Sequence, residues 1–137
     1  MKHNPSDRLR GLSEAEALLN RWISHWLEFG FGYWCVRETE RPRMIGYCGI
    51  KVVNLHDVEV LNLMYRFTPT AWGRGIATEA ASAVVTWAGE NQPHRRLLAR
   101  VRPQNVASQR VAVRAGLHRD PSLDDDGEDG PNLLFVR

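Results

Sequence analysis

The sequence predicts an α+β domain with a mixed, mostly antiparallel twisted sheet and helices on both faces. Two observations predict this fold class. Three segments rich in β-branched and aromatic residues follow one another between residues 33 and 67, which is typical of an antiparallel meander. Helical and strand-like segments then alternate up to the C-terminus. With 137 residues the chain can build one hydrophobic core, so we expect a single domain over residues 1–137, of which residues 1–12 form a loose polar arm.

An amphipathic helix is expected directly after this arm. Ser13 and Glu16 have the spacing of a capping box, and Gly30 has the position of a C-terminal cap. Apolar residues recur every three or four positions between them, which predicts one buried face. The aromatic residues between positions 22 and 34 fit core packing against the sheet better than an acceptor pocket. The predicted buried face consists of Leu19, Trp22, Ile23, Trp26 and Leu27.

Three strands are expected over residues 33–38, 44–53 and 58–67, separated by turn-prone residues. A helix with a small-residue face then starts at Gly73 and Gly75, and a strand follows over residues 97–101. A strand, a helix and a strand in this order predict a crossover between parallel neighbours. A last helix is expected over residues 105–115, and a final edge strand over residues 133–136. The acidic run before that strand suits either a solvated loop or the attraction of a cationic acceptor.

The composition excludes several classes of function. Eighteen Lys and Arg residues against 16 Asp and Glu residues give a net charge of +2, which is too balanced for a nucleic-acid-binding protein. There is no apolar stretch long enough for a membrane span and no export signal, so we expect a cytoplasmic protein. Cys35 and Cys48 are then expected to be reduced, and they lack the spacing of metal ligands.

Gly73 and Gly75 lie between a strand and a helix, where successive backbone N–H groups can converge on an anion. The segment lacks the Lys of a phosphate-binding P-loop and the third Gly of a dinucleotide fingerprint. Taken alone, it fits an anion site and a simple helix-starting turn equally well. Further on, Asn105 caps the last helix, and Ser108 lies one turn away on the same face.

Together, in this order and at this distance, the two segments resemble the acetyl-CoA-binding core of the GNAT (Gcn5-related) N-acetyltransferase superfamily. The resemblance is to its branch of ribosomal-protein N-terminal alanine acetyltransferases (RimJ/RimL-like). In that branch a strand ending in Tyr-Arg-Phe leads through Pro to Trp-Gly-x-Gly and Ala-Thr-Glu-Ala, as residues 65–80 do here. The branch's Asn-x-x-Ser segment, which leads to Gly-Phe or Gly-Leu, is matched by Asn105, Ser108, Gly116 and Leu117.

The resemblance implies that the chain uses acetyl-CoA as co-substrate and an amine as acceptor. It places the pantetheine arm along the backbone of Tyr65, Arg66 and Phe67, the pantetheine or thioester end at Asn105, and Ser108 near the sulfur. The side chains of Arg74, Arg110 and Arg114 suit either the cofactor's phosphates or a solvated helix face. The pyrophosphate is expected on the backbone amides of Trp72, Gly73, Arg74, Gly75, Ile76, Ala77 and Thr78.

The chain departs from the branch at two catalytic positions. Asn62 stands where the branch often has a Glu base, and Ala112 stands where many members of the superfamily have a Tyr acid. Ser108 is therefore the nearest candidate for the acid. Glu59 is the candidate base of the predicted site, with His56 and Asp57 as further candidates beside it. For any one of these three residues, a position in a surface loop without a catalytic role is the simpler interpretation.

The family's opening strand and helix have no counterpart before residue 13, because 12 polar residues cannot supply both. Either the chain is shortened relative to the family, or the acceptor side is assembled differently, for example with a partner subunit of a homodimer covering the exposed edge. Three functions stay open, in this order: an N-acetyltransferase for a protein N-terminus or a small amine, an acyl-CoA-binding module without turnover, and a domain that holds another phosphate ligand.

Overall fold

A computed structural model describes residues 11–127 and 130–137 of the chain. The predicted arm therefore lies almost wholly outside the described residues, and Leu12 already belongs to the first helix. The elements are α1 (Leu12–Phe29), β1 (Tyr33–Glu38), β2 (Arg41–Leu55), β3 (Val58–Phe67), α2 (Ile76–Asn91), β4 (Arg96–Val101), α3 (Val106–Arg114), β5 (His118–Arg119), β6 (Asp125–Gly127) and β7 (Gly130–Val136), with short 3-10 helices at Pro69–Ala71 and Pro121–Leu123.

The described strands form one mixed sheet in the order β1-β2-β3-β4-β7-β5, and β6 pairs with β7. Every pair is antiparallel except β3 and β4, which are parallel and joined through α2. The predicted fold class, meander and crossover are therefore confirmed. The prediction of an edge strand at the C-terminus is wrong, because β7 lies inside the sheet between β4 and β5. Leu134, Phe135 and Val136 are buried there, as a central strand requires.

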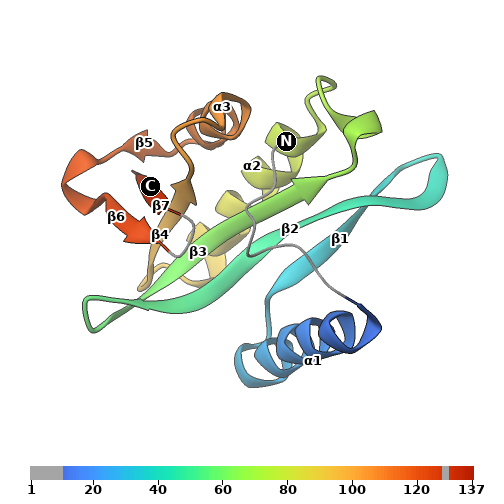
Figure 1. Ribbon diagram of the computed structural model, residues 1–137, viewed down its shortest axis with the longest axis horizontal. Coiled ribbons are helices and arrows are strands. Elements are labelled where there is room, and N and C mark those ends of the chain that lie inside the picture. Colours follow the sequence, from blue (N-terminus) through green and yellow to red (C-terminus); the bar gives the residue numbers. More distant parts are fainter. Residues whose placement is uncertain (1–10, 128–129) are drawn as a thin grey trace.

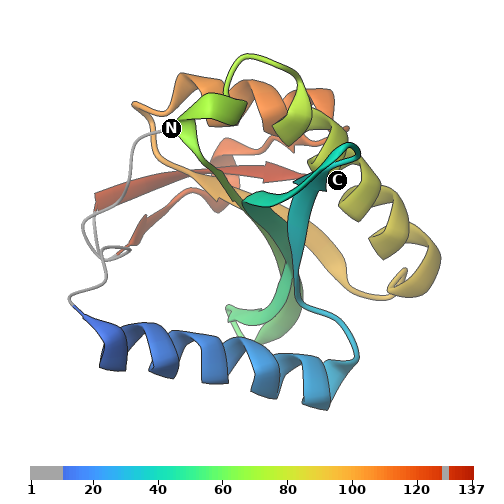
Figure 2. The same ribbon diagram turned by 90° about the vertical axis from the view of Figure 1, so that its right-hand side faces the viewer.

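The helices lie on both faces of the sheet, with α1 on one side and α2 and α3 on the other (Figures 1 and 2). Alternation along β3 divides its side chains between these two sides. Leu61, Leu63 and Tyr65 belong to the larger core cluster beneath α2 and α3. Val60 belongs to a smaller cluster on the opposite face, together with Leu98 of β4. Asn62 and Arg66, two and six residues after Val60, share its side of the strand.

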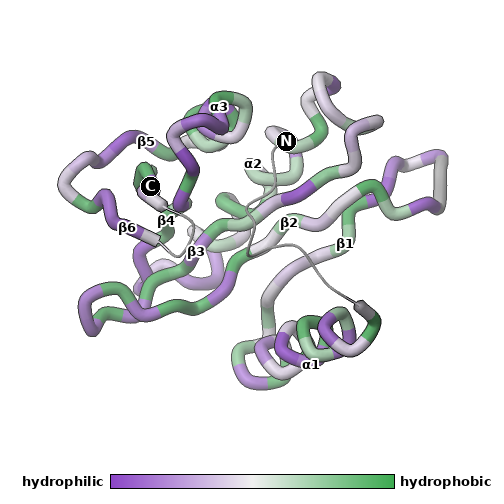
Figure 3. Tube along the Cα trace, viewed as in Figure 1, coloured by the Kyte–Doolittle hydropathy of each residue, from purple (hydrophilic) through white to green (hydrophobic). Residues whose placement is uncertain are grey.

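Helix α1 corrects two predictions. Gly11 is its N-terminal cap and no side-chain hydrogen bond caps it among the described residues, so Ser13 lies inside the first turn and the predicted capping box is wrong. Gly30 ends the helix in the left-handed conformation, as predicted (φ 77°). Figure 3 shows hydrophobic and hydrophilic residues interleaved along α1. The buried face was predicted only in part, because Leu19, Ile23 and Leu27 are exposed.

Aromatic rings, rather than the leucines, attach α1 to the sheet. The ring of Trp22 contacts the rings of Tyr33 and Tyr47, at 5.1 and 4.9 Å between centroids. Trp26 contacts Trp34, and its indole Nε1 donates a hydrogen bond to the carbonyl oxygen of Tyr33 (3.1 Å). This confirms that the aromatic residues pack the first helix against the sheet. The long side chains of Trp22 and Trp26 reach the strands, whereas Leu19 and Leu27 lie on the part of the helix surface that faces solvent.

His25 provides a polar contact between α1 and β2. The backbone N–H of Val52 donates to its Nε2 (2.9 Å), so Nε2 is the acceptor nitrogen of a neutral ring. The other ring nitrogen, Nδ1, therefore carries the proton and donates to the carbonyl oxygen of Phe31 (2.8 Å). One imidazole thus satisfies two backbone groups of different elements.

We expect His25→Leu to lower the free energy of unfolding by about 1–3 kcal/mol, because the N–H of Val52 and the carbonyl of Phe31 lose their shared partner. Urea denaturation followed by tryptophan fluorescence measures this change. The matched control is His94→Leu, since His94 is exposed in the turn after α2. Equal stabilities of the two variants would contradict the bridging role of His25.

Candidate cofactor-binding site

Gly73 and Gly75 form a left-handed turn that opens α2, as the sequence predicts. Both have a φ of 75°, and a Cβ atom at either position would meet nothing within 4 Å, so backbone conformation alone explains the need for glycine. Gly75 is the N-cap of α2, and among the described residues no side chain caps it. The first backbone N–H groups of α2 therefore stay available for an anion.

Strands β3 and β4 separate next to this helix N-terminus. They pair only at Val60, Leu61 and Asn62 of β3, among the described residues, whereas β2 pairs with β3 as far as Phe67. From Leu63 onward the side of β3 that faces β4 has no strand partner in the described chain. An extended ligand can therefore add to this side of β3 as a strand does.

A hollow of about 310 Å³ lies between the end of β3 and the N-terminal ends of α2 and α3. It gathers ten of the predicted binding residues. Arg66 and Arg74 do not line it: Arg66 is on the other side of β3, and the side chain of Arg74 is ion-paired with Glu38 (2.6 Å). The predicted residues that do line the hollow are Tyr65, Phe67, Trp72, Gly73, Gly75, Ile76, Ala77, Thr78, Asn105 and Ser108.

Hydrogen bonds join α3 to β3 at this hollow. The side-chain oxygen of Asn105 accepts from the backbone N–H of Ser108 (3.1 Å) and so caps α3, as predicted. The Ser108 hydroxyl donates to the Tyr65 hydroxyl (2.8 Å), which itself donates to the Ser108 carbonyl oxygen (2.7 Å). Burial raises the pKa of Tyr65 to about 12, although the hydrogen bond with Ser108 opposes the shift, so the phenol stays protonated at neutral pH.

The Tyr65 hydroxyl is a site group that sequence reasoning missed, because it assigned Tyr65 a role through its backbone alone. Alternation along the strand was the available signal. It places Tyr65 on the same side of β3 as Leu61 and Leu63, which is the side that α3 covers.

The structure does not bring the predicted base to Ser108. Glu59 lies near the start of β3, 57% exposed, with Oε1 3.2 Å from a guanidinium nitrogen of Arg95. The six residues from Glu59 to Tyr65 span about 20 Å of extended strand. His56 and Asp57 form the left-handed turn before β3, still farther away along the chain. A catalytic role for Glu59 stays a prediction, without a contact to the Ser108 end of the site.

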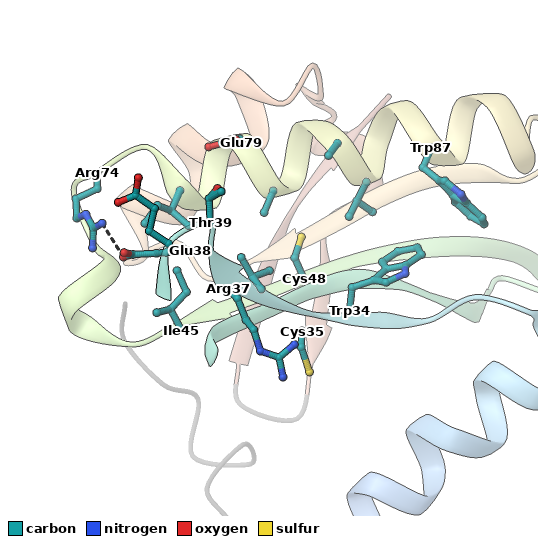
Figure 4. Close-up of a pocket in the computed structure, with 16 residues that line it drawn as sticks. Trp34, Cys35, Arg37, Glu38, Thr39, Ile45, Cys48, Arg74, Glu79 and Trp87 are labelled. Carbon is teal, nitrogen blue, oxygen red and sulfur yellow. Dashed lines mark ion pairs between the residues drawn. The ribbon is translucent and has the colours of Figure 1, made fainter. Parts of the chain in front are cut away.

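A larger cavity of about 770 Å³ lies on the other flank of α2, between this helix and β1 (Figure 4). Trp34 and Trp87 close one end with their rings 5.4 Å apart, and the Glu38–Arg74 ion pair lies at the other end. Cys48 faces this cavity, and burial raises the pKa of its thiol to about 12, which keeps it protonated. The cavity lacks the open strand edge and the helix N-terminus, so the smaller hollow has the better chemistry for an anionic, extended ligand.

Part of the acidic run near the C-terminus is occupied by arginines. Asp124 accepts two hydrogen bonds of 2.6 Å from Arg119, which lower the pKa of its carboxyl, and Asp125 lies 3.3 Å from Arg100. The carboxylates of Asp124 and Asp125 thus connect β6 and the residue before it to β5 and β4. These two side chains therefore form structural ion pairs, rather than a solvated loop or a surface that attracts a cationic acceptor.

Two further properties concern the chain as described over residues 11–127 and 130–137. These residues contain no cluster of three or more His, Cys, Asp or Glu side chains suited to a metal ion. They also contain no helix with the length and apolar character to cross a membrane.

Comparisons with known proteins agree with this geometry. Residues 1–118 match the family described as "Acetyltransferase (GNAT) domain". The chain is 30% identical over 95 residues to the uncharacterized protein YkkB of Bacillus subtilis, a match that covers 69% of this chain and 55% of YkkB. The chain thus spans little more than half the length of this curated relative.

Solved structures share the fold. An acetyltransferase from Agrobacterium tumefaciens is 27% identical with a TM-score of 0.79, over 96% of this chain and 75% of that protein. A ribosomal-protein-S5-alanine acetyltransferase from Vibrio fischeri has a TM-score of 0.74 at 16% identity, over 91% and 70% of the two chains. The aminoglycoside acetyltransferase AAC(6')-Ib, solved with coenzyme A, has a TM-score of 0.70 at 18% identity, over 90% and 75%.

Proposed function

Because the chain belongs to the GNAT acetyltransferase family, we propose that it transfers an acetyl group from acetyl-CoA to the primary amine of a protein N-terminus or a small molecule. One observation carries the proposal: the open side of β3 beyond Asn62 runs toward the uncapped N-terminus of α2. A molecule that joins an extended amide-containing arm to a diphosphate matches both features, and acetyl-CoA is such a molecule.

The residues present fit this co-substrate. The N–H groups after Gly75 and the α2 dipole favour the diphosphate, which carries negative charge. The backbone between Leu63 and Phe67 offers ladder hydrogen bonds to the pantetheine amides. Asn105 contributes to the site mainly by capping α3, because its side-chain oxygen is engaged with Ser108 N–H. The side chains of Arg110 and Arg114 also line the hollow, where they favour phosphate by charge.

In the transfer, the amine nitrogen bonds to the acetyl carbon, the C–S bond breaks, and its electron pair leaves on sulfur. The nitrogen sheds one proton, and the sulfur gains one, so the products are an amide and a thiol. Ser108 supplies the proton to sulfur from its hydroxyl and regains one from the solvent-borne proton that the amine released. Tyr65, protonated at neutral pH, holds Ser108 by two hydrogen bonds and thereby fixes the hydroxyl.

Two measurements test the proposal. Acetyl-CoA and CoA should raise the melting temperature, by an amount equivalent to about 2.7 kcal/mol at 100 times Kd, and ATP should not. Acetyl-CoA with a panel of alanine-initiated peptides, polyamines and aminoglycosides should then release free thiol. Stabilisation by ATP but not by CoA would overturn the proposal. Binding of acetyl-CoA without transfer to any amine would instead favour the acyl-CoA-binding module.

A further inference from the structure

Apart from the Tyr65 hydroxyl and the Cys48 thiol, Asn62 carries the one buried polar side chain among the described residues, at 9% exposure. Its amide oxygen, Oδ1, is fully buried and has no hydrogen-bond partner within the described chain. Leaving a buried acceptor unpaired costs about 1–3 kcal/mol, and native proteins retain few such groups without a reason. An unpaired buried oxygen therefore calls for an explanation other than fold stability.

The position of Asn62 supplies that explanation. It is the last residue of β3 that pairs with β4, so it lies at the point where the two strands begin to separate. The N-terminus of α2 follows the other end of this opening, after Phe67, about 17 Å of extended chain away. A co-substrate with its diphosphate at α2 and its arm along β3 therefore directs its acetyl end toward Asn62.

The side of the sheet also matters. Asn62 shares its side of β3 with Val60, whose cluster faces away from α2 and α3, whereas Tyr65 and Ser108 meet on the helix-covered side. The acetyl end thus lies between a proton donor on one side and an unpaired hydrogen-bond acceptor on the other.

We propose that Asn62 Oδ1 accepts a hydrogen bond from the N–H of the acceptor amine and so holds the amine nitrogen against the acetyl carbon. This inference rests on the proposed transferase function. A carbonyl oxygen can pair only with a donor, which a primary amine provides. Asn62 takes no proton: it orients the nitrogen lone pair, and the proton that nitrogen sheds leaves to solvent. Because the nitrogen gains positive charge as its bond to carbon forms, this hydrogen bond strengthens in the transition state.

Asn62→Leu is the central variant, because it removes the acceptor oxygen and keeps the number and branching of the side-chain heavy atoms. We expect kcat/KM for the amine to fall about 10- to 100-fold, since a hydrogen bond to a charged group is lost. The Kd for acetyl-CoA should stay unchanged, and the melting temperature should rise by about 3 °C, since the unpaired oxygen is gone. Asn62→Asp retains an oxygen at the same place and should retain most of the activity.

Asn54→Leu is the matched control, because Asn54 is exposed on β2. This variant should leave the activity unchanged and should not raise the melting temperature. If Asn62→Leu does not fold, Asn62→Ala compared with Asn62→Asp gives the same activity contrast. Wild-type rates in Asn62→Leu, or a lowered melting temperature in a variant that keeps its activity, would overturn the role of Asn62 alone. A wild-type protein that binds acetyl-CoA but acetylates no amine would overturn the proposed function and this inference with it.

Discussion

Replacing Ser108 with alanine should lower kcat about 100-fold and leave the Kd for acetyl-CoA essentially unchanged. The magnitude is that of removing a positioned general acid. The Ser108 hydroxyl lies 2.8 Å from the Tyr65 hydroxyl, which in turn is anchored on the Ser108 carbonyl, so rotation of one hydroxyl suffices to aim the proton into the hollow. Steady-state kinetics with acetyl-CoA and the best amine of the panel, together with calorimetric titration of acetyl-CoA, measure the two constants.

Two variants separate this role from a structural one. Ser13→Ala changes an exposed serine in the first turn of α1 and should leave kcat unchanged. Tyr65→Phe removes only the partner hydroxyl, so we expect a smaller loss of kcat than in Ser108→Ala, with some loss of stability because the Ser108 carbonyl loses a donor. A Ser108→Ala enzyme with wild-type kcat would show that solvent alone protonates the sulfur.

Replacing Gly75 with alanine should weaken acetyl-CoA binding by at least about tenfold. The residue has a φ of 75° and caps α2, so a Cβ atom costs roughly 1–2 kcal/mol of backbone strain and shifts the N–H groups that bind the diphosphate. The Cβ itself meets no protein atom within 4 Å, so it projects into open space beside the hollow that Gly75 lines rather than into the core. Calorimetric titration with acetyl-CoA measures the loss.

Gly30→Ala provides the matched control. Gly30 has a φ of 77° and equally open space around a Cβ atom, but it ends α1 away from the hollow. Both variants should therefore lose a similar amount of stability in denaturation, and only Gly75→Ala should lose affinity. Equal affinities in the two variants would place the diphosphate elsewhere than at α2.

The sequence was sufficient for the features that depend on local chemistry. Gly73, Gly75 and Asn105 adopt the turn and cap roles that their residue types favour, and the strands around them follow from β-propensity and period. The capping box failed for the same local reason, because Gly11 competes with Ser13 for the start of α1 and sequence spacing cannot rank the two.

The rest depended on contacts distant in the sequence. The meeting of Tyr65 and Ser108, 43 residues apart, follows from the packing of α3 on β3. The true packed face of α1 follows from rings on β1 and β2, and the internal place of β7 follows from β5, a strand of two residues with no readable period. The unpaired state of Asn62 Oδ1 likewise emerges only when both neighbouring strands are in place.

The attachment of α1 has a consequence for how the molecule opens. None of its 18 residues is buried, and the contacts to the sheet described above come from the rings of Trp22 and Trp26 and the imidazole of His25. Breaking them exposes little apolar surface compared with unfolding the sheet, so α1 belongs to the least protected cooperative unit of the fold. We therefore expect its amide protons to exchange with solvent through local detachment, at a free energy well below that of global unfolding, while β3 and α2 keep the binding hollow intact.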